Sequence, residues 1–279
     1  VSLADGAGRS VGKIGPDAVA ATCRLLLRGR IVAVKGLGGF QLACDATDER
    51  AVGRLRRAKR RECKPFALMA SELDVVRRYC TVGADEAAAL QSPAAPIVIM
   101  QAGAGGAVAA GVAPGVPTLG FMLPNTPLHH LLLHALDRPI VLTSGNVSDE
   151  PQCIGNDEAV TRLAGIAEYF LLHDRDITRR VDDSVVRRVA GRIRVVRRAR
   201  GYAPAPLRMP PGFSAASPVL AMGGELKNTF CLLRDGEAIL SHHMGDLGNA
   251  PTFADYTRSI EQYLACLLYT SDAADDLTR

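Results

Sequence analysis

The sequence predicts an α/β or α+β domain, with a twisted mixed sheet flanked by helices, followed by the start of a second domain. Segments with apolar residues at helical spacing alternate with short runs of Val, Ile and Leu, which are typical of buried strands. The 279 residues are 48% hydrophobic and 22% charged, as in a globular chain. This length suffices for one large domain, or for one domain and part of another.

Helices and strands alternate over most of the chain. Asp17, Asp48 and Thr126 are expected to cap helices, because their side-chain oxygens can accept hydrogen bonds from the first N–H groups of a helix. Gly29 is expected to end the first helix and Gly191 to form a hairpin turn. In chain order the sequence predicts a helix over residues 17–28, a strand over 31–34, a helix from 48, a strand over 66–69, a helix from 71, strands over 97–100 and 119–122, a helix from 126, strands over 140–142 and 169–172, and a hairpin over 185–196.

A proline-rich segment follows the hairpin. Residues 203–218 contain five Pro and no periodicity, which is typical of a linker. Further strands are expected beyond it, and Asp235-Gly236 favours a tight turn between the last two. These strands are expected over residues 219–222, 229–233 and 238–241. From Cys266 the preceding pattern is lost, so residues 266–279 are interpreted as a non-native tail.

The basic residues are segregated along the chain. Residues 50–64 hold eight Lys or Arg and one acid, and residues 175–200 hold ten Arg and three Asp. These two stretches together carry a net charge of +14, whereas the whole chain carries +4. Because Arg makes bidentate contacts with phosphate, we expect them to bind phosphates, nucleotides or nucleic acid. Two solvated faces would have the same composition, and this alternative stays open.

Several classes of protein are disfavoured. Seven Cys is an odd count without a C-x-x-C pair, and no apolar leader opens the chain, so we expect a reducing, cytoplasmic location and neither a disulfide scaffold nor a zinc ribbon. Residues 87–136 carry no charge, but six Pro interrupt them, so no spanning helix and no membrane association are expected. His130 and His134 have the spacing of zinc ligands on a helix, but three leucines separate them and structural roles are favoured.

Two clusters of polar residues are candidates for contact with a polyanion. Lys59, Arg61 and Lys64 lie at the end of the second predicted helix, where like charges repel unless an anion is bound. Their position also complements the helix dipole, which is the structural alternative. Ser144 and Asn146 follow a buried strand and can donate hydrogen bonds to a ligand, although an ordinary turn would contain the same residues.

A third candidate cluster lies in the second Arg-rich stretch. Asp182 and Asp183 are adjacent carboxylates that can hold Mg²⁺ or orient arginines, and Ser184 can donate to a phosphate. An exposed, salt-bridged loop is the alternative. Neighbouring arginines add anion-binding capacity: Arg180, Arg198 and Arg200. A P-loop motif and the third Gly of a dinucleotide fingerprint do not occur, so an ATP site must be of another kind.

Eight motifs resemble those of the HypF family of hydrogenase-maturation carbamoyltransferases, in the order of that family. They are KGLGGFQLACDAT (35–47), AKRRECKPFALM (58–69), SPAAPIVIM (92–100), LGFMLPNTPLHHLLL (119–133), LTSGN (142–146), FLLHDRDITRRVDDSVVR (170–187), RRARGYAPAPL (197–207) and GGELKNTFCLL (223–233). The resemblance implies a YrdC-like mixed sheet with flanking helices over residues 1–208 and a linker over 209–218. Over residues 219–265 it implies only the start of an actin/hexokinase-like carbamoyl-transfer domain.

The resemblance also implies an activity. In that family the YrdC-like domain joins ATP and a carbamoyl group from carbamoyl phosphate into carbamoyl-adenylate, releasing pyrophosphate. The second domain then passes the carbamoyl group to the C-terminal Cys of a HypE-type acceptor protein. Lys59 and Arg61 match the catalytic K-x-R pair, and ATP and Mg²⁺ are the implied cofactors. Together with the charge pattern, the resemblance gives these expected ligands of ATP and the carbamoyl group: Lys64, Ser144, Asn146, Arg180, Ser184, Arg198 and Arg200. Asp182 and Asp183 are the expected ligands of Mg²⁺, and no zinc site is expected.

Some residues depart from the family pattern. Gln41 and Glu62 stand where the family usually has His and Pro. An acylphosphatase domain, C-x-x-C zinc modules and a later His-rich metal motif do not occur in these residues, so we expect only the adenylating half of the reaction. Two other functions stay open: a YrdC-like module that binds double-stranded RNA through a basic face, and a threonylcarbamoyl-adenylate synthase, against which the GGELKNT motif argues.

Overall fold

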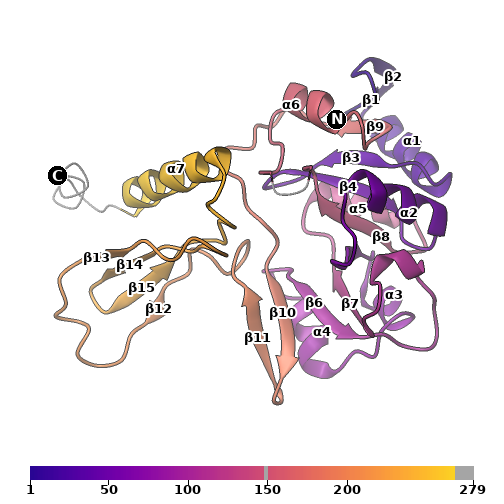
Figure 1. Ribbon diagram of the computed structural model, residues 1–279. Coiled ribbons are helices and arrows are strands. Elements are labelled where there is room, and N and C mark those ends of the chain that lie inside the picture. Colours follow the sequence, from indigo (N-terminus) through magenta and orange to yellow (C-terminus); the bar gives the residue numbers. More distant parts are fainter. Residues whose placement is uncertain (148–149, 268–279) are drawn as a thin grey trace. The chain divides into compact units, whose positions relative to one another are not determined.

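The computed structural model describes residues 1–147 and 150–267 (Figure 1). The chain folds as two compact units, residues 1–196 and 197–279. The first contains helices around an eleven-stranded mixed sheet, and the second contains a four-stranded antiparallel sheet with one long helix. Residues 266–279 were interpreted as a non-native tail. Residues 268–279 of this segment lie outside the described residues.

The elements of the first unit alternate as the sequence predicts. In chain order they are β1 (Ser2–Asp5), β2 (Ser10–Ile14), α1 (Pro16–Leu27), β3 (Val32–Lys35), β4 (Phe40–Asp45), α2 (Glu49–Ala58), β5 (Ala67–Met69), α3 (Leu73–Arg77), α4 (Ala84–Leu90), β6 (Ile97–Gln101), the short 3₁₀ helix η1 (Ala110–Val112), β7 (Thr118–Met122), α5 (Pro127–His134), β8 (Ile140–Ser144), α6 (Asn156–Leu163), β9 (Tyr169–Leu172), β10 (Val185–Val189) and β11 (Arg192–Arg197).

Four neighbouring strands form the middle of the first sheet. The strand order is β11-β10-β6-β7-β5-β8-β4-β3-β9-β1-β2. β3 pairs parallel with β9, and β4 pairs antiparallel with both β3 and β8. β8, β3 and β9 therefore run in one direction, so their carboxyl ends lie at the same edge of the sheet, where β4 begins.

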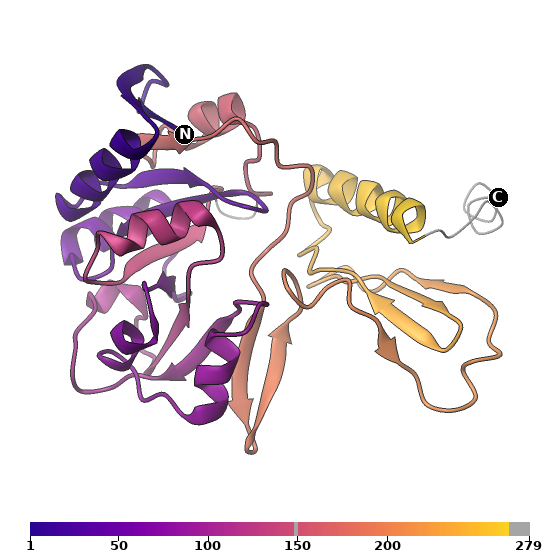
Figure 2. The same ribbon diagram turned by 180° about the vertical axis from the view of Figure 1, so that it is seen from behind.

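Helices cover both faces of this sheet. α1 and α5 lie on the face turned toward the viewer in Figure 2. Their apolar side chains pack with alternate residues of the strands, such as Val32, Val34, Ala43 and Leu142. The other face receives α2, whose Val52 and Leu55 are fully buried. Burial of this apolar surface is the main stabilising contribution to the unit.

Helices α2 and α5 begin at the residues that the sequence predicts as their caps. The Asp48 side chain accepts hydrogen bonds from the backbone N–H groups of Arg50 and Ala51 at the start of α2. Thr126 accepts one from His129 N–H at the start of α5. The first helix differs, because it begins at Pro16 after Gly15 and makes no side-chain cap bond. Asp17 instead lies in the first turn, where a negative charge stabilises the amino end of a helix.

The second unit is built on β12 (Leu207–Arg208), β13 (Val219–Ala221), β14 (Cys231–Arg234), β15 (Glu237–Leu240) and α7 (Ala250–Cys266). Its strand order is β12-β15-β14-β13. The Phe230 ring packs against Tyr263 of α7, with ring centroids 5.0 Å apart. Asp235 and Gly236 have positive φ, as the predicted hairpin turn requires.

The division between the units differs from the predicted boundary at residue 208. β12 pairs with β15, so residues 207–208 belong to the second sheet. The expected linker over 209–218 is correspondingly a loop between two strands of that sheet, because β13 follows it. Proline-rich composition marked the loop correctly as irregular, but composition does not say whether the flanking strands share a sheet.

The predicted fold class is confirmed, although several elements, among them β1, β2, β4, α4 and α6, were not expected. β4 was not expected because it follows four residues rich in Gly and is buried on both faces, so it lacks alternation. α4 and α6 were not expected because each begins after a glycine. In both, a Glu three residues on accepts a hydrogen bond from that glycine N–H: Gly83 with Glu86, and Gly155 with Glu158. Within residues 1–147 and 150–267, none of the helices combines the length and hydropathy needed to cross a bilayer.

Candidate functional site

The candidate site lies at the sheet edge where β8, β3 and β9 end and β4 begins. Gln41 is paired with Ser144 of β8 on one side and with Val34 of β3 on the other. Val34 is in turn paired with Leu171 of β9. Since adjacent strands are about 4.8 Å apart, residues from distant parts of the sequence meet here within a short distance.

Lys59 joins the first two predicted clusters. The end of α2 directs its side chain to the loop after β8, and the side chain is only 2% exposed. Lys59 Nζ donates hydrogen bonds to the backbone oxygens of Ser144 at 2.6 Å and Asn146 at 2.8 Å, and to Asn146 Oδ1 at 3.0 Å. Ser144 Oγ donates to the same Oδ1 at 2.7 Å. The loop over 144–146 is therefore held directly by a buried lysine.

The environment of Lys59 changes its protonation. Burial, followed by the neighbouring charges of Arg61 and Lys64, lowers the pKa of Lys59 to about 7. Three acceptors match the three N–H groups of an ammonium ion, and they favour the charged form. A polyanion bound beside this group would favour the charged form further.

The lowered pKa gives an expected pH dependence of stability. The ordinary pKa of lysine is 10.5 and that of folded Lys59 is about 7, so between these values the unfolded chain binds the additional proton. The free energy of unfolding is therefore expected to rise with pH over this window, by up to about 1.4 kcal/mol per pH unit from this group. Urea unfolding at pH 7 and pH 9 gives the change in the free energy of unfolding with pH for wild type and for Lys59→Met. The difference between these two changes is the contribution of Lys59. Parallel pH profiles for the two proteins would contradict the assignment.

Arg61 and its neighbours form the basic side of the site. Arg61 Nε donates to the Lys64 carbonyl at 2.9 Å, and Arg61 Nη1 to Thr143 Oγ1 at 3.4 Å. The guanidinium carbons of Arg56 and Arg61 lie 4.5 and 5.0 Å from the centroid of the Phe66 ring. These contacts fix two guanidinium groups beside the strand end that carries Ser144. Lys64 is exposed, and its backbone oxygen is one of the acceptors that hold Arg61 in place.

Two glycines allow backbone segments to approach closely at the site. A Cβ at Gly38 would overlap the backbone of Val181, and Val181 N–H donates to the Gly38 carbonyl at 3.0 Å. A Cβ at Gly145 would lie 2.6 Å from the Phe40 carbonyl oxygen, which accepts a hydrogen bond from Gly145 N–H. The glycine-rich loop after β3 therefore packs on the segment that precedes β10, and the loop after β8 packs on β4.

The third predicted cluster reaches the site through two amide side chains. Gln152 Nε2 donates to Asp182 Oδ1 at 2.5 Å, and Arg180 Nε donates to the Gln152 carbonyl at 2.6 Å. Gln41 Nε2 donates to Asp183 Oδ2 at 3.3 Å. Because Gln41 is paired with Ser144, the segment over 180–183 is held at the same sheet edge as Lys59.

Gln41 also connects the site to α5. Its Oε1 lies 3.1 Å from Nε2 of His129, a ring that is 2% exposed, and Nδ1 of the same ring lies 3.1 Å from Asn125 Oδ1. Gln41 therefore bridges a buried histidine and Asp183. The sequence showed only that Gln41 replaces the usual His, and its amide supplies the donor and the acceptor that this bridge uses.

Asp182 and Asp183 were predicted to hold Mg²⁺. Asp182 accepts a hydrogen bond from the Gln152 amide, and Asp183 accepts one from the Gln41 amide. Within the described ranges, no group of three or more His, Cys, Asp or Glu side chains is arranged to hold a metal. Mg²⁺ commonly takes one or two carboxylates and completes its shell with phosphate oxygens and water, so the donor set suits a metal that arrives with a nucleotide.

The predicted residues divide between the two units. Lys59, Arg61, Lys64, Ser144, Asn146, Arg180, Asp182, Asp183 and Ser184 all belong to the first unit. Ser184 is fully buried, and its carbonyl accepts from Ile97 N–H at 2.8 Å, so it anchors the start of β10. Arg198 and Arg200 belong to the second unit, where Arg198 donates to the carbonyls of Tyr202 and Ala205.

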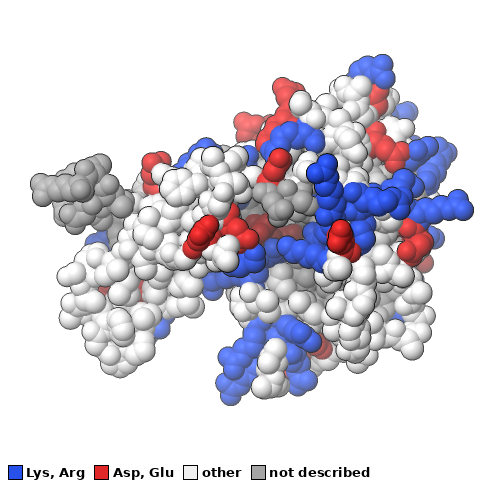
Figure 3. All heavy atoms as spheres, viewed as in Figure 1, with Lys and Arg blue, Asp and Glu red and all other residues white. Residues whose placement is uncertain are grey.

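Charge in the first unit is gathered as the sequence predicts. Figure 3 shows Lys and Arg side chains over and around α2, and a second group at the tip of the β10–β11 hairpin. The hairpin arginines lie on strands whose residues are largely exposed. Residues 180–183 of the second Arg-rich stretch contact the site.

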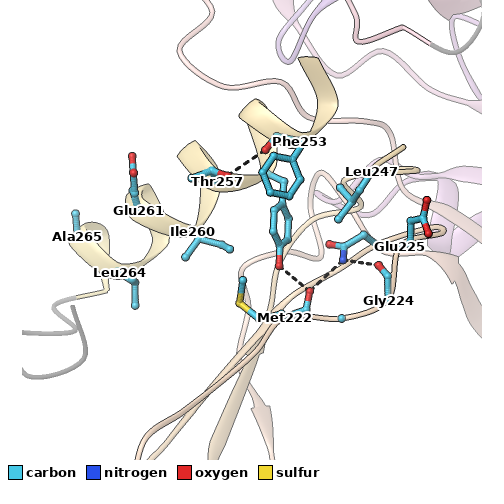
Figure 4. A pocket seen from close by; sticks show the side chains of 13 residues that line it. Met222, Gly224, Glu225, Leu247, Phe253, Thr257, Ile260, Glu261, Leu264 and Ala265 are labelled. Carbon is cyan, nitrogen blue, oxygen red and sulfur yellow. Dashed lines mark hydrogen bonds between the residues drawn. The ribbon is translucent and has the colours of Figure 1, made fainter. Parts of the chain in front are cut away.

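A separate hollow of about 770 Å³ lies within the second unit, between α7 and the loop after β13 (Figure 4). Tyr256 Oη donates to the Met222 carbonyl at 2.8 Å, and Asn228 Nδ2 donates to the carbonyls of Met222 and Gly224. These bonds hold the Gly223-Gly224 turn against the helix. The remaining lining is mainly apolar side chains of α7, such as Ile260 and Leu264.

Comparison with known proteins gives a consistent result. A family model described as telomere recombination, of the Sua5, YciO and YrdC proteins, matches residues 24–199, and a model described as the HypF Kae1-like domain matches residues 214–274. The carbamoyltransferase HypF of Rhodobacter capsulatus is 51% identical over 249 residues, 89% of this chain and 33% of the relative. That of Synechocystis is 47% identical over 83% of this chain and 30% of the relative.

Solved structures agree with these relatives. A crystal structure of full-length HypF in the phosphate- and nucleotide-bound form is 44% identical, with a TM-score of 0.87, and the match covers 94% of this chain and 34% of that one. The crystal structure of HypF from T. kodakarensis is 35% identical, with a TM-score of 0.88 over the same shares. The chain thus spans about a third of the length of these proteins.

Proposed function

The chain belongs to the Sua5, YciO and YrdC family and continues into a HypF-type domain, and from this premise we propose that its first unit forms carbamoyl-adenylate. ATP and a carbamate derived from carbamoyl phosphate are the proposed substrates, and pyrophosphate is the proposed product. A HypE-type protein is the proposed acceptor in the later transfer, which is assigned to the HypF-type domain that residues 214–274 match. The described cysteines are all free thiols, which supports a reducing cytoplasm as the proposed location.

One observation carries the proposal. Buried Lys59 binds the loop that holds Ser144 and Asn146, so the basic end of α2 and the polar end of β8 form a single cluster. Arg61 contacts the preceding Thr143. Fixed cations at a strand end suit a triphosphate, because their charge offsets the negative charge of the phosphate oxygens.

The proposed reaction needs no covalent enzyme nucleophile. A carbamate oxygen attacks the α-phosphorus of ATP, and a new P–O bond forms as the bond to the oxygen bridging to the β-phosphorus breaks. Pyrophosphate leaves with that electron pair. The protein aligns the two reactants and offsets the phosphate charge with Lys59 and Arg61. Mg²⁺ bound with the nucleotide would supply further charge neutralisation, with Asp182 and Asp183 as its proposed ligands.

ATP–pyrophosphate exchange tests this proposal on the full chain. Radiolabel from pyrophosphate is expected to appear in ATP only when carbamate is present, added as ammonium carbamate or formed by hydrolysis of carbamoyl phosphate, because reversal of the reaction requires carbamoyl-adenylate. Exchange that requires threonine and bicarbonate would instead identify a threonylcarbamoyl-adenylate synthase. Salt-sensitive binding of duplex RNA without exchange under either condition would contradict adenylation and favour an RNA-binding module.

A further inference from the structure

A second buried lysine lies at the same sheet edge, outside the cluster around Lys59. Lys35 ends β3 and is 3% exposed. It points to the face opposite to Val34, because side chains alternate along a strand. Its hydrogen bond among the described residues goes from Nζ to the carbonyl oxygen of His173, at 3.0 Å. An ammonium ion has three N–H groups, so this lysine has the capacity to donate to a ligand.

Two further polar atoms beside Lys35 are buried without a hydrogen-bond partner in the described part of the chain. They are Asn156 Oδ1 and His173 Nδ1. Asn156 Nδ2 donates at 3.2 Å to the same His173 carbonyl that Lys35 contacts. This hydrogen bond fixes the orientation of the Asn156 side-chain amide, because in the opposite orientation Oδ1 would face the His173 carbonyl oxygen and the two oxygens would repel each other. Buried polar atoms without partners are costly, so two of them beside a buried ammonium indicate a place for a ligand.

The charge around Lys35 restricts the ligand. Burial lowers the pKa of Lys35, and nearby Asp176 and Asp174 oppose that effect, so two carboxylates share the environment of this ammonium. A cluster with two acids and one lysine disfavours a triphosphate, which carries several negative charges. A phosphate group also has no N–H to donate to Asn156 Oδ1. The polar atoms suit a small ligand with one negative charge and an N–H donor.

From this geometry we propose that Lys35, Asn156 and His173 form the subsite for the carbamate end of the substrate. The inference rests on the proposed function and adds to it the place of the second reactant. A carboxylate oxygen of carbamate accepts from Lys35 Nζ, and its amino group donates to Asn156 Oδ1. β4 lies between β3 and β8, so the ends of β3 and β8 are about 10 Å apart. The proposed subsite and the Lys59 cluster therefore lie at the same edge of the sheet but at different positions along it.

The first test separates the two substrates in the exchange assay. In Lys35→Met the apparent KM for ammonium carbamate is expected to rise at least about tenfold, because a hydrogen bond to a charged ligand is lost. The Kd for ATP measured without carbamate is expected to stay within about twofold of wild type. Asn156→Asp is expected to raise the same KM, since a third carboxylate beside Lys35 would repel carbamate. Lys13→Met is the matched control, because Lys13 is exposed on β2.

The second test measures binding without catalysis. In a solution of ¹³C-bicarbonate and ammonia, carbamate and bicarbonate give separate carbon resonances. The wild-type protein and the Lys59→Met variant are expected to bind carbamate and so to broaden its resonance but not that of bicarbonate. The Lys35→Met variant is expected to broaden neither resonance. Selective broadening of the carbamate resonance by a wild-type protein that shows no ATP–pyrophosphate exchange would support the subsite and contradict the adenylation proposal. Exchange in wild type, with broadening and KM unchanged in Lys35→Met, would overturn the subsite alone. Loss of ATP affinity in Lys35→Met would assign the cluster to the nucleotide and also overturn it.

Discussion

Lys59→Met is expected to reduce ATP–pyrophosphate exchange by about 10²–10³-fold, which is the usual effect of removing one fixed charge that stabilises a transition state. The lysine contributes in two ways. Its charge lies in a buried environment, where an interaction with a phosphate is stronger than in water. Its three hydrogen bonds also hold Ser144 and Asn146 in place. Methionine has a similar length but supplies neither effect.

A second variant separates charge from geometry at this position. Lys59→Arg keeps the charge, but a planar guanidinium does not match the three acceptors around Nζ, so exchange is expected to fall as well. Far-UV circular dichroism checks that both variants fold, and Lys13→Met controls for the loss of a lysine at an exposed site. Exchange within about threefold of wild type in folded Lys59→Met would remove this residue from the mechanism.

Gly145→Ala is expected to destabilise the first unit by about 1–3 kcal/mol and to abolish exchange. The added methyl group would lie 2.6 Å from the Phe40 carbonyl oxygen and 2.7 Å from both its carbonyl carbon and its Cβ. These atoms belong to a central strand and cannot move without disturbing β4. The loop would therefore shift away from β4 and from Lys59, which is the arrangement that the site depends on.

The matched control is Gly165→Ala. A Cβ at Gly165 meets no atom within 4 Å, so the same substitution is expected to leave the thermal midpoint and exchange close to wild type. Thermal unfolding followed by circular dichroism measures the stability of both variants. If Gly145→Ala unfolds at the wild-type temperature and retains exchange, the close packing of this loop on β4 has no role in the site.

Local features of the sequence predicted the elements that carry the site. Asp48 and Thr126 have short side chains that accept from helix N–H groups, and both helices begin where these residues predict. Like charges crowded around Lys59 and Arg61 indicated an anion site. The helices that begin after Gly83 and Gly155 were missed, because their start depends on a glutamate contact that only the folded turn creates.

The partners of the site residues could not be predicted in this way. Gln41, His129 and Asp183 are far apart in sequence, and the bridge between them exists only because β4 lies between β3 and β8 and faces α5. Gln152 was likewise missed, since its contact with Asp182 depends on the path of two loops. Lys35 carried one local signal, a lysine at the end of a buried strand.

The sequence by itself determined the fold class, the family and the residue types that can bind phosphate, because periodicity, capping and charge are local properties of the chain. The tertiary structure decided which of those residues act together. Strand order placed the ends of β8, β3 and β9 at one edge, which unites Lys59 with Ser144 and brings Lys35 to the same edge. Burial then changed the chemistry of both lysines, since desolvation, which no local pattern encodes, lowers the pKa of a buried amine.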